Sequence, residues 1–431
     1  MSISLSDYGK LHLSSTNYTA HDPTTTESAA RAAAVAFRAG ASLRVRGGGH
    51  SLSGMSLPRD GEVLIRTRGL DAFRVTAPGR LVVGAGATMW DVRDLAEAHG
   101  WKLPVYNGGW AGPTVGGYVS AGGMGLRVPP TERARAAEHP DEGQLDLLSV
   151  SEMHGGFWEH VHAIDLVDGT GTRRRIDEDN PDFPWLFASC GQFGVILEVE
   201  LKLQRDSGPD SLPTGAEGRV PKMNPVMPGE TDDPSPEAGM PWLYWFSYLL
   251  PEAAEAQAWD FLDGWCRENA DIVEPSGGWV GPERNGAPIG FRYRVTSRRF
   301  TPPLLYPRHE DFLLMGVMAH AHGIGRIERD ERLVAAERAF VEAALSNGWS
   351  LYAQAENLSR SLDYAAYLGP DRMARFLELK GRYDPEGRLN PGEIVAGAAR
   401  RPLRMSTARK MVRAMARAFA PGERTEQETT T

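Results

Sequence analysis

The chain has 431 residues, of which 41% are hydrophobic and 24% charged, and its formal net charge at pH 7 is −9. This composition is typical of a soluble globular protein, and the length predicts two domains. The negative charge argues against nucleic acid or an anionic membrane as the main partner.

Targeting and metal signals are missing from the sequence. Residues 1–24 contain no charged stretch followed by an apolar one, and no apolar run is long enough to span a bilayer, which predicts a cytoplasmic protein. Cys190 and Cys266 show no metal-ligand spacing, so neither a disulfide framework nor a zinc site is expected. His320 and His322 are too few for a metal, and a structural pair is favoured over catalysis.

The first predicted elements are a helix and a strand that leads into a glycine turn. Thr24 and Glu27 have the spacing of a capping box before an alanine-rich run. Leu43 and Val45 alternate with arginines and predict a short strand. That strand runs into Arg46–Gly54, which reads Arg-Gly-Gly-Gly-His-Ser-Leu-Ser-Gly.

Three consecutive glycines allow the backbone to approach a ligand closely. Gly47, Gly48 and Gly49 can aim successive N–H groups at one anion, such as a pyrophosphate. The alternative is a tight turn between two strands. The turn is not the Gly-x-Gly-x-x-Gly turn that opens a helix, because it leads into a further predicted strand.

The next elements continue an α+β pattern. Glu62–Ile65 and Leu81–Val83 predict strands, and Thr88 and Asp91 cap a helix over Met89–His99. Together with the glycine turn, these elements indicate a nucleotide-binding layout.

A second concentration of glycines lies at Gly108–Gly125. So many glycines are expected where the backbone lies against something flat, such as a ring system, and the alternative is a surface loop. Arg127–Gly143 is charged, shows no period and predicts either a mobile lid or a passive insertion, of which the insertion is favoured.

Strands and a composition break follow. Ala163–Val167 and Val195–Leu203 predict strands, and Asp168-Gly-Thr-Gly predicts a hairpin turn. The stretch Asp206–Gly239 is rich in Pro, Gly, Glu and Asp, and predicts a domain boundary.

The sequence beyond the break predicts a second α+β unit with helices on one face of a sheet. The patterns indicate strands at Trp242–Leu250, Ile289–Val295 and Phe312–Met318, and amphipathic helices from Glu252 and around Leu333–Val341.

Five motifs resemble those of one family, and they occur in that family's order. They are Arg46–Gly54, Pro113–Gly117 with Ser120–Gly123, His154–Val161, Gly191–Ile196 and Tyr383–Gly392. Together they resemble the FAD-linked oxidases of the vanillyl-alcohol oxidase (p-cresol methylhydroxylase) type, and most closely the cytokinin-dehydrogenase-like and berberine-bridge-like members. Five motifs in order carry far more weight than one.

The resemblance implies an α+β fold in which a two-part FAD-binding domain holds an inserted substrate domain. The inserted domain is expected to have an antiparallel sheet covered by helices. The expected limits are residues 1–205 for the FAD-binding domain, 206–350 for the substrate domain, 351–400 for the return to the FAD-binding domain, and 401–431 for a basic amphipathic helix and tail.

The resemblance also implies how FAD is held. The Gly47–Ser51 turn would cradle the pyrophosphate, and His50 would be attached to the 8α carbon of the flavin, for which a neutral imidazole nitrogen is a suitable nucleophile. The alternative for His50 is an uncharged turn histidine. No cysteine lies near the Pro-Thr-Val-Gly turn, so a single attachment is expected, and Cys190 would lie against the cofactor. The expected cofactor-binding residues are Arg46, Gly47, Gly48, Gly49, His50, Ser51, Pro113, Thr114, Gly116, Gly117, Ser120, Gly122, Gly123, Gly155, Gly191, Ile196 and Asn390.

The expected chemistry is hydride transfer to N5 of the flavin, and this requires a proton acceptor near the substrate. Tyr352 is the first candidate for that base and Glu356 the second, with Glu152, His154 and Tyr106 behind them. The alternatives are a buried structural tyrosine and solvated carboxylates. Cytokinin dehydrogenases use an aspartate at the position of Gly109, so cytokinin oxidation is not expected.

The sequence therefore predicts an FAD-dependent oxidase or dehydrogenase acting on a C–OH or C–N bond of a small, partly apolar molecule, such as a secondary metabolite. Dioxygen is the expected electron acceptor, no nucleic acid or membrane partner is expected, and the oligomeric state is open. Two alternatives remain. One is an oxidative or non-redox cyclase of a natural-product pathway, and the other is a catalytically silent flavin-binding scaffold.

Overall fold

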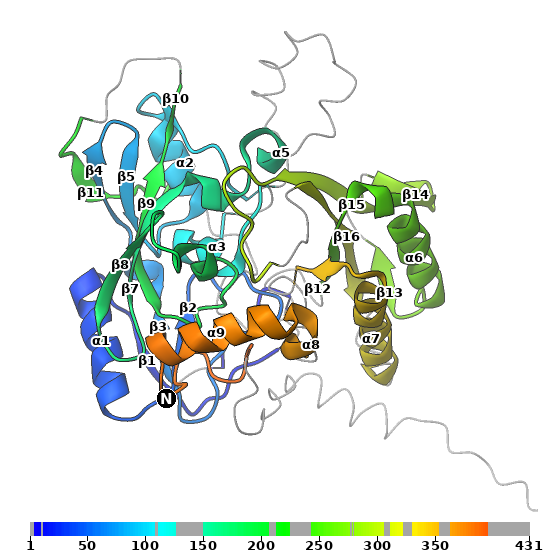
Figure 1. Ribbon diagram of the computed structural model, residues 1–431, viewed down its shortest axis with the longest axis horizontal. Helices are drawn as coiled ribbons and strands as arrows, with labels where there is room; N and C mark the ends of the chain where they lie inside the picture. The colour runs from blue at the N-terminus through cyan, green and yellow to red at the C-terminus, as the bar shows by residue number, and fades with distance from the viewer. Residues whose placement is uncertain are drawn as a thin grey trace, which may run out of the picture.

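The computed structural model describes residues 4–9, 12–107, 111–125, 150–206, 213–224, 243–275, 278, 280–305, 311–321, 330–352 and 363–394. The predicted insertion Arg127–Gly143 and the basic tail from Arg401 lie outside these residues. The described elements form a parallel three-stranded sheet, two six-stranded sheets and a two-stranded ribbon of β6 (Trp101–Lys102) and β10 (Gln204–Arg205) (Figure 1). No helix among the described residues is both long enough and apolar enough to cross a membrane.

The parallel sheet supports the glycine turn. Its order is β1 (Thr19–His21), β3 (Val63–Arg66) and β2 (Leu43–Arg46). Helix α1 (Thr26–Arg38) buries a face of small residues, which lets the helix approach β2 and β9 closely. The predicted strands at β2 and β3 are therefore confirmed.

The cap of α1 corrects the predicted one by one residue. Thr25 is the N-cap, and its side chain accepts a hydrogen bond from the backbone N–H of Ser28. The Ser28 hydroxyl closes the box in place of the expected pair of Thr24 and Glu27. Serine, threonine and acidic residues all occur here, so spacing alone selected the wrong frame.

The first six-stranded sheet has the order β11-β4-β5-β9-β7-β8 and is antiparallel throughout. Its strands are β4 (Ala72–Ala77), β5 (Arg80–Gly84), β7 (Val161–Val167), β8 (Arg173–Asp177), β9 (Val195–Lys202) and β11 (Glu217–Arg219). The predicted strands at β5, β7 and β9 are confirmed, and the turn at residues 168–171 joins β7 to β8. The strands β4, β8 and β11 were not predicted from the sequence. Strand β8 consists mostly of arginines, β11 has only three residues, and β4 carries a charged residue, Arg74, that pairs with Glu198 on β9.

Two helices begin side by side next to this sheet. Thr88 caps α2 (Met89–Glu97) by accepting from the N–H of Asp91, as predicted, although the helix ends at Glu97 instead of His99. Thr114 caps α3 (Val115–Ala121) in the same way, and the backbones of Thr88 and Thr114 form an isolated bridge. Helix α3 was not predicted, because its glycines hide any apolar period.

The second six-stranded sheet is antiparallel, with helices on one face. Its order is β14-β15-β16-β12-β17, with β13 paired to β16. The strands are β12 (Leu243–Leu250), β13 (Val273–Pro275), β14 (Val280–Arg284), β15 (Ala287–Thr296), β16 (Asp311–Ala321) and β17 (Ser350–Leu351). Helices α6 (Glu255–Glu268) and α7 (Asp330–Asn347) cover it on the right in Figure 1. Helix α6 begins at Glu255, after a short 3₁₀ turn over Glu252–Ala254 where the sequence predicted its start.

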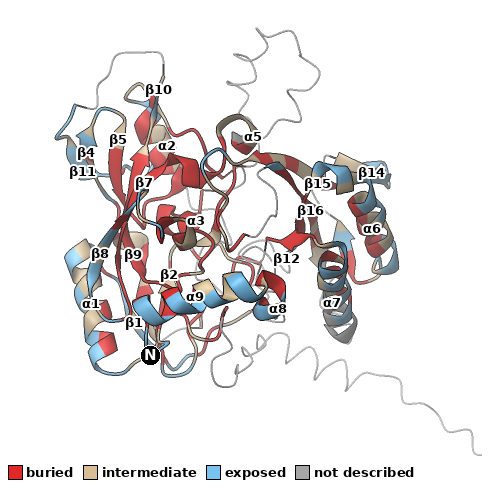
Figure 2. Ribbon diagram, viewed as in Figure 1, coloured by how far each residue is buried: buried red, intermediate tan, exposed pale blue. Residues whose placement is uncertain are grey.

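Aromatic side chains form the core between this sheet and its helices. The ring centroids of Phe246 and Trp265 are 4.6 Å apart, and those of Tyr248 and Phe340 are 4.0 Å apart. The Tyr248 hydroxyl donates to the carbonyl oxygen of Phe340 at 2.8 Å. Figure 2 shows that the central strands of both six-stranded sheets, such as β9 and β12, are buried, whereas the strands at the edges and the outer faces of the helices are more exposed. The prediction of an antiparallel sheet with covering helices is thus confirmed.

The chain then returns to the glycine turn. Short helices α5 (Val150–His154) and α8 (Tyr364–Leu368) lie near the second sheet, and α9 (Pro370–Tyr383) carries the chain back below the first (Figure 1). Residues 388–390 run beside β2. The N–H of Leu43 donates to the carbonyl oxygen of Arg388 at 2.8 Å, and the N–H of Asn390 donates to the carbonyl oxygen of Leu43 at 2.9 Å.

Candidate cofactor and active site

A cavity of about 690 Å³ lies between the glycine-rich turns and the second six-stranded sheet. Its size falls within the range of small-molecule and cofactor sites. One part of its wall comes from the turn after β2, the segment from Pro113 through α3, and the turn before β9. The other part comes from β12, β15 and β16, so the cavity joins the glycine-rich region to the second six-stranded sheet.

The glycine turn packs directly on the second glycine cluster. A Cβ added at Gly48 would overlap the carbonyl oxygen of Gly112, and one added at Gly47 would overlap the hydroxyl of Thr114. Only glycine fits at these two positions, because the two turns approach each other so closely. The backbone of the glycine turn therefore faces the cavity without side chains, where a phosphate group could lie.

His50 lies in the cavity wall under an aromatic ring. The rings of Tyr8 and His50 are stacked, with centroids 4.0 Å apart and planes inclined by 22°. Arg46 lies outside the wall, where its guanidinium donates to the carbonyl oxygen of Ser6 at 2.8 Å. Arg46 thus holds residues 4–9 against the glycine turn instead of facing the cavity.

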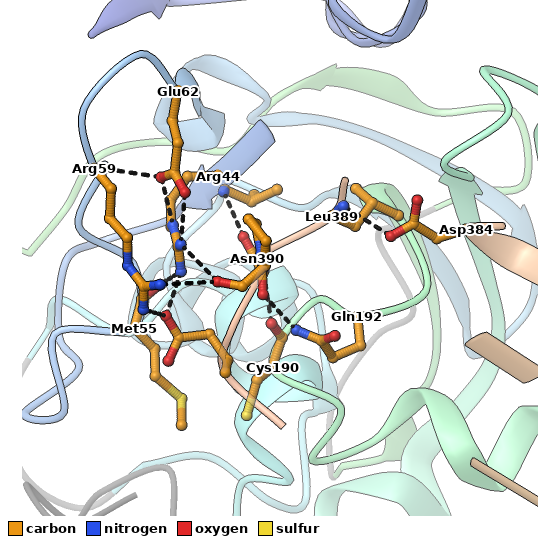
Figure 3. Close-up of polar contacts among 12 residues, drawn as sticks. Arg44, Met55, Arg59, Glu62, Cys190, Gln192, Asp384, Leu389 and Asn390 are labelled. Atoms are coloured by element: carbon orange, nitrogen blue, oxygen red, sulfur yellow. Dashed lines mark hydrogen bonds and ion pairs between the residues drawn. The ribbon is translucent and has the colours of Figure 1, made fainter. Parts of the chain in front are cut away.

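Asn390 joins strand β2 to the turn at Cys190, as Figure 3 shows. Its side-chain oxygen accepts from the N–H of Val45 at 3.2 Å, and its side-chain N–H₂ donates to the carbonyl oxygen of Cys190 at 2.6 Å. Gln192 donates to the carbonyl oxygen of Asn390 at 2.8 Å. Both Asn390 (φ 40°) and Cys190 (φ 52°) adopt left-handed backbone conformations, which cost free energy and occur most often at functional sites.

A buried charge cluster surrounds Arg44, which lies on the strand that leads into the turn (Figure 3). Arg44 is fully buried and donates to both carboxylate oxygens of Glu62, at 3.0 and 2.9 Å, and to Glu393 at 2.5 Å. Burial opposes the charge of Arg44, but Glu393 and Glu62 outweigh it and raise the pKa of the guanidinium above its usual value. Burial likewise opposes the charge of Glu62, and Arg44 outweighs it, so the pKa of Glu62 is lowered.

The second sheet contributes an apolar wall. Residues paired across antiparallel strands point to the same face, and the register pairs Leu243 with His320, Trp245 with Met318, and Tyr293 with Leu314. All six line the cavity, and Phe291 joins them with its ring 5.2 Å from that of Trp245. Because Phe246 and Tyr248 point the other way toward the helices, this sheet separates a core face from a cavity face.

The buried polar atoms of the wall that have no hydrogen-bond partner among the described residues include an O–H and an N–H donor. They are the hydroxyl of Tyr118 and the indole N–H of Trp245. Burial raises the pKa of Tyr118 well above its usual value, so the hydroxyl keeps its proton. A buried donor without a partner costs about 1–3 kcal/mol, and a bound molecule with acceptor groups would remove that cost. The glycine cradle and these donors together fit a large cofactor such as FAD.

The predicted catalytic residues are separated by the structure. Tyr352, which follows β17, lies in the wall, and burial raises its pKa above the usual tyrosine range. Glu152 lies on α5, outside the wall, with a carboxylate oxygen 3.9 Å from Arg294. Glu356 lies outside the described residues. No aspartate or glutamate occurs among the described wall residues, whereas His320 does.

Most of the predicted cofactor-binding residues line this one cavity. They are Gly47, Gly48, Gly49, His50, Ser51, Pro113, Thr114, Gly116, Gly117, Ser120, Gly191, Ile196 and Asn390. Arg46, Gly122, Gly123 and Gly155 do not line it, and Gly122 instead ends α3 at φ 67°. For all of these residues, inside and outside the wall, the contacts with FAD stay predictions.

Sequence analysis missed Tyr8 and most of the apolar wall. Tyr8 meets His50 only through the fold, so no local signal marked it. Strand β12 is apolar on both faces, so alternation could not show which face would line a cavity.

Comparisons with known proteins agree with this site. Residues 21–136 match the FAD binding domain family. The chain is 33% identical over 85 residues to a D-lactate dehydrogenase of Archaeoglobus fulgidus. The aligned stretch covers 20% of this chain and 19% of that protein. It is 28% identical over 159 residues to the FAD-linked oxidoreductase ptmO of Penicillium ochrochloron, and this aligned stretch covers 36% of this chain and 29% of that protein.

These matches support an enzyme of the FAD-dependent oxidoreductase class. The matched residues include β2, the Gly47–Ser51 turn and the Pro113–Gly117 turn, which are the parts that form the cradle. The chain spans less than a third of the length of either relative. The narrower resemblance to the vanillyl-alcohol oxidase type stays a prediction.

Proposed function

We propose that this protein is an FAD-dependent oxidoreductase that oxidises a C–OH or C–N bond of a small, partly apolar molecule. The observation that carries the proposal is that a single cavity joins the glycine cradle and His50 to an apolar sheet face. The cradle suits a cofactor with a pyrophosphate, and the apolar face suits its substrate.

The residues proposed to hold FAD are the Gly47–Ser51 and Pro113–Gly117 turns. Asn390 links β2, which leads into the first of them, to the turn at Cys190. His50 is the proposed point of covalent attachment. Cys190 also lines the cavity, whereas Cys266 is buried in α6. Mutation of His50 and of Cys190 in turn therefore distinguishes an attachment through the histidine from one through the cysteine. When bound, FAD would accept a hydride from the substrate, and dioxygen is the proposed final acceptor.

The protein's own contribution is binding, orientation and exclusion of water. Leu243, Trp245 and Phe291 give the substrate an apolar surface, and the N–H of Trp245 offers a donor to an acceptor atom on it. A general base must also take the proton from the oxidised group. Tyr352 and His320 are the described wall residues considered for that role, in addition to Glu356 from the sequence.

Two measurements test the proposal. In wild type and Cys190→Ser, flavin absorbance should remain with acid-precipitated protein, and it should be lost in His50→Ala. In an anaerobic screen of alcohols and amines, a substrate should bleach the flavin absorbance. Flavin that is released from wild type by acid would reject the covalent attachment. Conversion without bleaching or peroxide would instead indicate a non-redox cyclase, and the absence of any bleaching substrate would favour a silent scaffold.

A further inference from the structure

Residues 4–9 form a segment that lies over the glycine turn. The N–H of Tyr8 donates to the carbonyl oxygen of Ser51 at 3.0 Å, and Arg46 donates to Ser6 at 2.8 Å. The segment folds back on itself as well, because the N–H of Ser14 donates to the carbonyl oxygen of Leu5 at 2.8 Å. The segment is therefore attached to the residues on both sides of His50.

Tyr8 is the side chain of this segment that reaches the cavity. It is 3% exposed and packs in one apolar cluster with Leu52 and Leu243, against which Trp245 and Met318 also pack. Leu52 belongs to the glycine turn and the other three to the second sheet. Tyr8 thus fills the junction between the two parts of the cavity wall and stacks on His50 from there.

The stack restricts the orientation of the imidazole. A histidine ring rotates broadly about its χ2 bond, so an unsupported ring samples many orientations. A near-parallel ring at 4.0 Å favours one ring plane. Holding a nucleophile in the right orientation speeds bond formation, because the entropy of orientation has already been lost.

We propose that Tyr8 is a positioning residue that holds the imidazole of His50 in the plane needed for attachment to FAD. The inference rests on the proposed attachment through His50. In that attachment, a bond between a ring nitrogen of His50 and the 8α carbon replaces one N–H and one C–H bond. The two electrons and two protons released reduce one dioxygen to hydrogen peroxide.

The test measures the rate of attachment in the full-length chain. Wild type, Tyr8→Phe and Tyr8→Leu are produced without flavin in a riboflavin-starved host and are then mixed with FAD in air. The flavin retained after acid precipitation is then followed with time and divided by the flavin bound before precipitation. This ratio excludes unfolded protein. Tyr8→Phe keeps the stack and should match wild type, whereas Tyr8→Leu should be slower by about two- to tenfold, the factor expected for one aromatic pair.

Tyr18→Leu is the matched control, because Tyr18 is also a buried tyrosine near residues 4–9 but packs with Leu5, Leu57 and Leu64 away from His50. It should attach FAD at the wild-type rate. If Tyr8→Leu binds no FAD, Tyr8→Ile replaces it. A wild-type rate in the Tyr8 variant, or equal slowing by Tyr18→Leu, would overturn the role of Tyr8 and leave the His50 attachment intact. Wild type that never retains flavin would overturn the attachment itself, and this inference with it.

Discussion

Glu393 accepts a hydrogen bond from Arg44 inside the protein, with Oε1 2.5 Å from Nη1, although 349 positions separate the two residues in sequence. Both side chains are almost completely buried, at 1% and 0% exposed. The pair attaches the C-terminal return to the strand that delivers the glycine turn, so the shape of the cradle depends on residues from both ends of the chain.

Loss of Glu393 should strongly destabilise the protein. In Glu393→Ala, Arg44 keeps Glu62 but loses its second carboxylate, and breaking a buried ion pair costs about 3–5 kcal/mol. Chemical denaturation should show this decrease in the free energy of unfolding. The control is Asp22→Ala, which removes the exposed partner of Arg66 and should cost less than about 1 kcal/mol. Equal losses in the two variants would contradict a special role for the buried pair.

A single methyl group at Gly48 should weaken FAD binding. The added Cβ of Gly48→Ala would overlap the carbonyl oxygen of Gly112, so the two turns must move apart. Such overpacking costs about 1–3 kcal/mol, which we expect as a roughly 5- to 150-fold rise in the dissociation constant of non-covalent FAD, measured in a His50→Ala background. Gly264→Ala is the control, because a Cβ there meets nothing within 4 Å in helix α6, and its FAD binding should be unchanged. Unchanged binding in Gly48→Ala would show that the turns do not form the cradle.

The general base should be identified by comparing two wall residues. Burial raises the pKa of Tyr352, which favours a protonated hydroxyl that donates a hydrogen bond to the substrate over one that takes a proton from it. We expect Tyr352→Phe to lower kcat/KM only by about tenfold, and His320→Gln to lower kcat by about 100-fold or more, the usual effect of losing a general base. Steady-state kinetics on a substrate from the anaerobic screen provides the measurement. The reverse order would instead support Tyr352 as the base.

The stability of the fold should fall in mild acid because of His160. Its Nε2–H donates to the carbonyl oxygen of His154 at 2.9 Å, and burial, only partly offset by that bond, lowers the pKa of His160 to about 4. In the unfolded chain a histidine binds its proton near pH 6.5, so the unfolded state takes up more protons as the pH falls from 6.5 to 4. This single group should therefore cost about 2 kcal/mol of folding stability between pH 7 and pH 5.

Denaturant unfolding at the two pH values checks this expectation. His160→Gln should lose clearly less stability than wild type over the same interval, because glutamine binds no proton. The exposed His21 is the control, and His21→Gln should follow wild type. If His160→Gln loses as much stability as wild type, the acid sensitivity arises elsewhere.

The local parts of the site could be predicted from the sequence because they depend on a few neighbouring residues. Glycines permit backbone conformations that other residues avoid, and a threonine before a helical pattern favours a helix start, whatever surrounds them. The Gly47–Gly49 turn and the cap at Thr88 were therefore predicted. Strand β9 was visible because its apolar residues alternate. Strand β8 could not be predicted because three consecutive arginines hide any apolar alternation. Two of them, Arg173 and Arg175, pair with Glu198 and Glu200 on β9, and those partners are not evident from local sequence.

The sequence by itself determined where the glycine turns lie, where the strands with clear apolar patterns and the amphipathic helices lie, and which residue, His50, follows the glycines. Only the tertiary structure decided that Tyr8 lies on His50, that Glu393 reaches Arg44, and that the Trp245 face of its sheet lines the cavity. The physical reason is distance along the chain. Backbone preferences act over a few residues, whereas these contacts arise from sheet pairing and the packing of segments that are far apart in sequence.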